Sequence, residues 1–317
     1  MSQAVDLSLG VADPALDLFG LQAAIEAAAP AGAAEARYAP RGGVPALRRT
    51  IAALEGVAPE QVSVTVGASM ALTATFAQLP AGARVVLPRP YFPAYPNMLS
   101  VLNRRAAFYD VGPGSAPLDQ IRRELAAGAA AVVVTTPGNP LGNVARAATV
   151  ARIAEAARKA GALLILDETY AGTVFDPPED GAYLGAGVLD GAVRIRSLSK
   201  RFQLPGARVG YLVAGAGRVA AIEAVHWTFA MSVPAGAQLL AAAALLADAR
   251  RGADPAPLRR LAGLCARAAG WLRRWHARQA SWSRTARRSA PARLRCAAAS
   301  RCRKRASTGR SRGWATC

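Results

Sequence analysis

The stretch that decides the fold lies late in the chain, where residues 193–200 read VRIRSLSK and residues 204–211 read LPGARVGY. The first segment is an apolar and basic run that ends in hydroxyl side chains and Lys200, and Arg208 follows a Pro-Gly turn eight residues later. We expect the run to be a strand end with Lys200 at its mouth. A lysine there can attack a carbonyl carbon, while the hydroxyls and the arginine hold a phosphate beside it. This combination is typical of a site for pyridoxal phosphate (PLP).

Short β-rich runs alternate with amphipathic helical stretches between residues 62 and 213. The predicted strands are 62–66, 84–87, 131–135, 162–166, 193–196 and 209–213, and the helices between them are 70–78, 91–102, 118–126 and 149–160. Residues 216–248 and about 255–274 are also expected to be helical. The alternation predicts an α/β domain with a mainly parallel sheet flanked by helices. Ligands of such sheets bind at the carboxyl ends of the strands, where the polar motifs described below also fall.

Asp167 and Tyr170 follow the predicted buried strand 162–166. A carboxylate at this point can pair with the protonated pyridine nitrogen of PLP, which keeps the ring an electron sink. Tyr170 can donate to the oxygen on the same ring. Taken alone, Asp167 is better explained as the cap of a helix.

Asn139 lies in the segment 137–142, PGNPLG, which follows the predicted strand 131–135. Its amide can donate to the same ring oxygen of the cofactor. Taken alone, the segment is better explained as a plain turn.

Two further motifs can contact the cofactor. Residues 67–69, Gly-Ala-Ser, join a predicted strand to a helix, and backbone N–H groups at such a helix start bind phosphate. In isolation an ordinary serine cap at Ser69 is the better explanation. Phe92 can stack on the face of the pyridine ring, although an aromatic at such a place is otherwise core or surface packing.

The order and spacing of these motifs resemble the class I and II aminotransferases, the PLP-dependent enzymes of fold type I. The resemblance covers roughly residues 5–275. It is carried by Tyr38 in YAPRGG, Gly67-Ala68-Ser69, Tyr91-Phe92, Asn139-Pro140-x-Gly142, Asp167-Glu168-x-Tyr170, Ser197-x-Ser199-Lys200 and Arg208. The last three motifs together are the most specific part of the pattern.

The resemblance implies a role for each matching residue. Lys200 would hold the cofactor covalently and move a proton, Asp167 would pair with the pyridinium, and Tyr170 and Asn139 would bind the ring oxygen. The phosphate cup would consist of Ser197, Arg208, Ala68 and Ser69, and Phe92 would stack on the ring. Tyr38 is similar to the residue that reaches the phosphate of the neighbouring subunit, which implies a homodimer.

The basic charge is concentrated at the end of the chain. Residues 1–250 hold 21 basic and 19 acidic side chains, whereas residues 251–317 hold 18 basic and 1 acidic side chain. The division predicts an N-terminal segment (1–35), a PLP-binding large domain (36–250), a connecting helix (251–275) and an Arg-rich tail (276–317). Without a long uncharged apolar run or a signal peptide, we expect a cytoplasmic protein. No metal site is expected, because the spacing of His276 and the tail cysteines fits no ligand pattern.

The tail departs from the family, which continues there into a small domain with an arginine for the substrate carboxylate. One interpretation is a basic arm that contacts nucleic acid through arginine and tryptophan. The other is an out-of-frame translation of GC-rich DNA, because Arg, Ala, Ser, Cys and Trp accumulate while acidic residues disappear after Asp254. We favour the second interpretation and expect no nucleic-acid partner.

The expected activity is transfer of an amino group from an amino acid to a 2-oxo acid. Two alternatives remain open: a PLP-dependent lyase or decarboxylase of the same fold, and a truncated, inactive PLP-binding protein. Without a small domain the site would be open to water. We therefore expect the cofactor to bind and turnover to be slow or absent.

Overall fold

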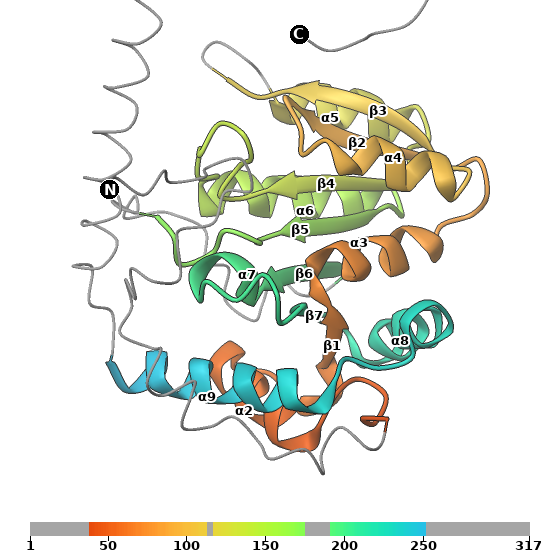
Figure 1. Ribbon diagram of the computed structural model, residues 1–317. Helices are drawn as coiled ribbons and strands as arrows, with labels where there is room; N and C mark the ends of the chain where they lie inside the picture. The colour runs from red at the N-terminus through yellow and green to blue at the C-terminus, as the bar shows by residue number, and fades with distance from the viewer. Residues whose placement is uncertain (1–37, 113–116, 175–190, 252–317) are drawn as a thin grey trace, which may run out of the picture. The chain divides into compact units, whose positions relative to one another are not determined.

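The computed structural model describes residues 38–112, 117–174 and 191–251, which contain one seven-stranded sheet (Figure 1). The strand order is β1-β7-β6-β5-β4-β2-β3. The strands are β1 (Val62–Val66), β2 (Arg84–Arg89), β3 (Arg105–Asp110), β4 (Ala131–Thr135), β5 (Leu163–Asp167), β6 (Ala192–Ser197) and β7 (Val209–Val213). β7 is antiparallel to both of its neighbours, β1 and β6, and the other pairs are parallel. The predicted α/β fold with a mainly parallel sheet is confirmed.

Helices cover both faces of the sheet, because the central strands bury side chains in both directions. On one face Val133 and Ile165 pack with residues of α3, α4 and α8, and on the other Val132 and Leu164 pack with residues of α5 and α6. α9 packs against α2. The helices are α2 (Pro45–Glu55), α3 (Gly67–Ala77), α4 (Ala94–Val101), α5 (Pro117–Ala126), α6 (Ala147–Lys159), α7 (Leu198–Arg201), α8 (Ala216–Ala230) and α9 (Ala235–Arg251), with a 3₁₀ turn η3 (Pro59–Gln61).

The direction of β7 brings the functional segments to one edge of the sheet. β4, β5 and β6 end at this edge, while the antiparallel β7 begins there. In the register, Val66 lies opposite Val209, and Ser197 lies opposite Gly210. Arg208, which precedes β7, therefore lies near the start of α3 and the end of β6.

The predicted strands agree with the structure within two residues, but one strand was missed. β3 has the sequence RAAFYD and pairs on one side with β2 at the end of the sheet, so it lacks the continuous apolar pattern of the buried strands. The helical region 216–248 is two helices, because Met231 has a positive φ of 55° and Pro234 cannot donate a backbone hydrogen bond.

Three of the predicted regions cannot be compared with the structure. The N-terminal segment (1–35), the connecting helix beyond Arg251 and the tail (276–317) lie outside the described residues. None of the helices in the described ranges combines the length and the apolar content needed to cross a bilayer.

Candidate functional site

Asp167 is a buried carboxylate at the end of β5, with a relative exposure of 4%. The phenol of Tyr95 donates to its Oδ2, and the backbone N–H of Thr169 donates to its Oδ1 over 3.0 Å. Tyr95 Oη also lies 2.9 Å from Oγ1 of Thr135, at the end of the neighbouring strand β4. Burial raises the pKa of Tyr95 well above its usual value, and the charge of Asp167 adds to the rise. The phenol therefore keeps its proton and acts as a donor to the carboxylate.

The helix-cap explanation of Asp167 is wrong, because no helix follows β5 among residues 168–174. Asp167 instead orders the turn after the strand through Thr169.

Asn139 and Tyr170 meet above the ends of β4 and β5. Nδ2 of Asn139 lies 3.5 Å from Oη of Tyr170, and a hollow of about 320 Å³ lies between their two loops. Asn139 also occupies a turn, since the N–H of Gly142 bonds the carbonyl of Gly138. The turn explanation is therefore right and is compatible with the expected position beside Tyr170. Burial, followed by the charge of Asp167, raises the pKa of Tyr170, so its phenol also remains a donor.

Lys200 lies in α7, which begins immediately after β6. Ser197 caps this helix, because its Oγ accepts from the N–H of Ser199 over 3.1 Å while its own hydroxyl proton remains a donor. Lys200 Nζ lies 5.7 Å from the ring centroid of Tyr170. Burial lowers the pKa of Lys200, and the charge of Arg208 lowers it further. A larger fraction of the amine is therefore neutral at a given pH, and the neutral amine is the nucleophile.

The guanidinium of Arg208 lies against the start of α3, where a cation and free backbone N–H groups together form a cradle that can bind an anion. Gly67 has a φ of +66°, and a Cβ placed on it would lie 2.6 Å from Nη2 of Arg208. A Cβ on Gly210 would lie 2.6 Å from the backbone nitrogen of Ala68. Glycine at both positions lets β7 and the guanidinium approach the helix start. α3 begins at Gly67 without a side-chain cap, so Ser69 lies inside the first turn and the serine-cap explanation is wrong.

Two predicted contacts lie further from this cradle. Phe92 packs edge-on against the ring of Tyr95, with 5.5 Å between the ring centroids, and so lies one side chain away from Asp167. Tyr38 is 72% exposed and packs edge-on against Trp227 at 6.5 Å.

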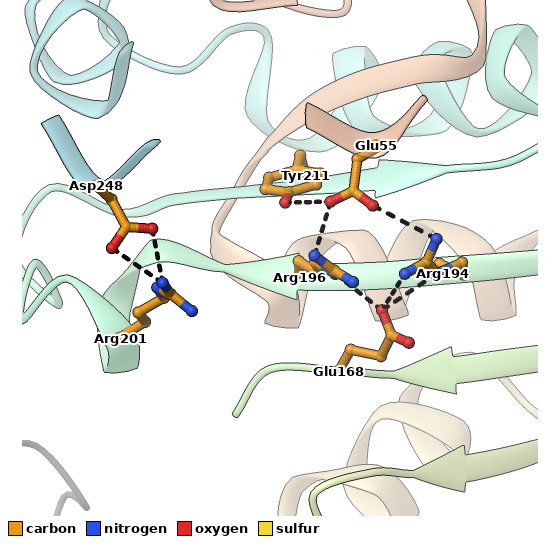
Figure 2. A network of polar contacts seen from close by, with 7 residues as sticks. All are labelled: Glu55, Glu168, Arg194, Arg196, Arg201, Tyr211 and Asp248. Atoms are coloured by element: carbon orange, nitrogen blue, oxygen red, sulfur yellow. Dashed lines mark hydrogen bonds and ion pairs between the residues drawn. The ribbon is translucent and has the colours of Figure 1, made fainter. Parts of the chain in front are cut away.

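Glu168, the residue after Asp167, belongs to a buried ionic network (Figure 2). Oε2 of Glu168 accepts from Nη2 of Arg194 at 3.0 Å and from Nε of Arg196 at 2.8 Å. Both arginines also pair with Glu55 of α2, at 3.4 and 2.8 Å, and the Tyr211 phenol donates to Glu55 over 2.7 Å. Two cations and two anions are thus paired inside the protein.

A separate ion pair joins α7 to α9 in the same view. Nη2 of Arg201 lies 2.9 and 2.7 Å from the two carboxylate oxygens of Asp248 (Figure 2). This pair fixes the helix that carries Lys200. Our sequence reasoning identified neither the pair nor the network, and it did not single out Tyr95.

Residues 4–259 match the family model described as aminotransferase class I and II. The chain belongs to this family. The cofactor of class I and II aminotransferases is PLP. The residues at the carboxyl edge fit PLP: the Gly67–Arg208 cradle suits its phosphate, and the buried Asp167 suits its protonated ring nitrogen.

Several named proteins are similar to this family member. Valine–pyruvate aminotransferase of Mycobacterium tuberculosis is 31% identical over 223 residues, which are 67% of this chain and 57% of the relative. A probable aminotransferase of Arabidopsis thaliana, TAT2, is 32% identical over 189 residues, which are 56% of this chain and 45% of the relative. The structure of N-succinyldiaminopimelate aminotransferase from Mycobacterium tuberculosis matches with a TM-score of 0.68 and 29% identity, over 76% of this chain and 65% of that one. The chain spans about half the length of the curated relatives that it matches.

Proposed function

We propose that this chain contributes the cofactor site of a PLP-dependent aminotransferase, which moves an amino group from an amino acid to a 2-oxo acid. The observation that carries the proposal is the convergence of three chemically different groups at one edge of the sheet. These are the amine of Lys200 with its lowered pKa, the buried carboxylate of Asp167 and the anion cradle of Gly67 and Arg208.

Each side chain at the edge has a proposed task. PLP, when bound, supplies an electron sink for the carbanion that forms at the substrate. Lys200 binds the cofactor covalently and then carries a proton at its Nζ, and Asp167 keeps the ring nitrogen protonated. Asn139 and Tyr170 donate to the ring oxygen, and Phe92 packs on the ring. The phosphate is bound by Ser197, Arg208 and the start of α3 at Ala68 and Ser69.

The large exposure of Tyr38 supports a homodimer in which this side chain reaches the partner's phosphate site. An aromatic side chain that is 72% exposed and packs on one edge of Trp227 has an open face for a second chain. The boundaries of the large domain, 36–250, also remain part of the proposal, and the cytoplasmic location stays a prediction.

A lyase or a decarboxylase of the same fold could use the same cofactor contacts. The relatives described above carry the name aminotransferase, and this favours transfer. One similar protein of Arabidopsis thaliana, SUR1, which is 29% identical over 55% of this chain, carries the name lyase, so the reaction products decide between the two. Products separate these reactions: transfer yields a 2-oxo acid and consumes an acceptor, whereas the others release ammonia or carbon dioxide.

The test is a stoichiometric assay of the 317-residue chain with PLP, a mixture of amino acids and a 2-oxo acid acceptor. We expect slow formation of a new 2-oxo acid, equal in amount to the acceptor consumed, and none with Lys200→Ala. Ammonia or carbon dioxide released without consumption of the 2-oxo acid acceptor would contradict the proposal.

A further inference from the structure

Tyr95 touches two residues that the proposed function assigns to the cofactor. Its ring meets Phe92, the aromatic expected on the ring face, and its phenol meets Asp167, the carboxylate expected at the ring nitrogen. The side chain is fully buried in the core between α3, α4 and the sheet. Tyr95 therefore links two proposed cofactor contacts that come from different parts of the sequence.

The contacts of Asp167 fix the orientation of its carboxylate. Oδ2 accepts from Tyr95, and Oδ1 accepts from the N–H of Thr169 over 3.0 Å, so each oxygen has a donor from a different element. Thr135 Oγ1, 2.9 Å from the phenol oxygen, fixes Tyr95 in turn. Both donors are neutral, so they orient the anion without cancelling its charge.

We infer that Tyr95 is a positioning residue for the cofactor, acting through Asp167: its phenol aims the carboxylate at the pyridine nitrogen of PLP. This inference rests on the proposed function. Without the phenol, the carboxylate loses the donor on Oδ2 and rotates more freely about its side-chain bond. The ring nitrogen then meets a carboxylate with a less fixed direction, and the cofactor is held less tightly.

The chain offers a matched control in Tyr109. This tyrosine is 3% exposed, and its phenol donates to the carbonyl of Val133 over 3.0 Å. It packs in the core on the other face of the sheet, with α5 and α6. Tyr109→Phe therefore removes a buried phenol of the same kind without touching Asp167.

The experiment compares Tyr95→Phe with Tyr109→Phe in the full 317-residue chain. The readouts are the Kd for PLP and the circular dichroism that the bound PLP acquires per mole. We expect Tyr95→Phe to raise the Kd about tenfold, the size of one hydrogen bond to a charged group, and to reduce the dichroism. Tyr109→Phe should leave both unchanged, while both variants lower the melting temperature.

The outcomes separate this inference from the proposed function. A wild-type chain that binds no PLP overturns the proposed function, and this inference with it. Wild-type binding with an unchanged Kd and dichroism in Tyr95→Phe overturns this inference alone, as does an equal change in Tyr109→Phe. If Tyr95→Phe does not fold, Thr135→Val is measured instead; it should raise the Kd about threefold, and wild-type values would overturn the inference.

Discussion

Asp167 and Glu168 are consecutive acidic residues with almost the same burial, yet their surroundings differ in kind. Glu168 lies in a closed network with Arg194, Arg196 and Glu55, in which buried charges are paired by the protein itself (Figure 2). Asp167 is held by neutral donors, and within the described part of the chain it forms no ion pair. A buried anion without a cation is costly, and in our proposal the protonated ring nitrogen of PLP supplies the missing positive charge. We propose that, of the two neighbours, Glu168 stabilises the fold and Asp167 forms part of the cofactor site.

Glu168→Gln should produce the largest loss of stability, because it removes the ion pairs of Glu168 with Arg194 and Arg196. The change leaves the arginines with an uncompensated buried positive charge, which costs about 3–5 kcal/mol of unfolding free energy. Urea unfolding of the chain without PLP measures it. A loss below about 1 kcal/mol would show that the network is not closed in the way described.

Asp167→Asn should weaken the binding of PLP and leave the free energy of unfolding almost unchanged. Removing a buried anion that neutral groups hold relieves a desolvation cost, so the unfolding free energy of the chain without PLP should stay the same or rise. The Kd for PLP should rise about a hundredfold, because the ring nitrogen loses its ionic partner.

The two acidic-residue variants control each other, since both replace one carboxylate by an amide. If Asp167→Asn destabilises the chain as much as Glu168→Gln, the two acids do not differ as we describe. Equal losses of PLP affinity would count against the same distinction.

A smaller effect should be a dependence of stability on pH that arises from His226, near the proposed phosphate cradle. Nε2 of His226 accepts from the N–H of Val66, one residue before Gly67, so the imidazole must be neutral at this atom. Burial lowers the pKa of His226 in the folded chain. The unfolded chain then binds the proton more readily, so stability falls as the pH drops below the ordinary histidine value of about 6.5.

His226→Gln should remove this acid-side loss, because the glutamine oxygen can accept the same N–H without titrating. Glu223, one turn earlier in α8, acts with the opposite sign: burial raises its pKa, so its protonation favours the folded chain. The free energy of unfolding in urea is measured for wild type and variant at about pH 7.5 and about pH 5.5. The difference between the two proteins at each pH isolates the contribution of the histidine. If the difference in free energy of unfolding between wild type and variant is the same at both pH values, His226 is not the group whose protonation destabilises the chain.

Much of the candidate site could be proposed from the sequence, because Asn139, Asp167 and Lys200 each lie at the carboxyl end of a predicted strand or within four residues of it. The partners of these residues could not, since Tyr95 reaches Asp167 from a helix 72 residues earlier. The network was missed for a related reason, although a signal existed. Arg194 and Arg196 alternate with buried apolar residues in β6, so they lie on one face of a buried strand and require acidic partners there.

The central claim is that Lys200 and its neighbours form the PLP site, and the chain makes a direct test possible because it has three lysines, Lys159, Lys200 and Lys304. Lys159 is exposed and paired with Glu155 at 2.7 Å, so it serves as an internal control. The measurement is incubation of the full chain with PLP, borohydride reduction, and mapping of the modified lysine by mass spectrometry. We predict that Lys200 carries the label and that Lys159 and Lys304 remain largely unmodified. A label spread equally over the three lysines, or none on Lys200, would contradict the account.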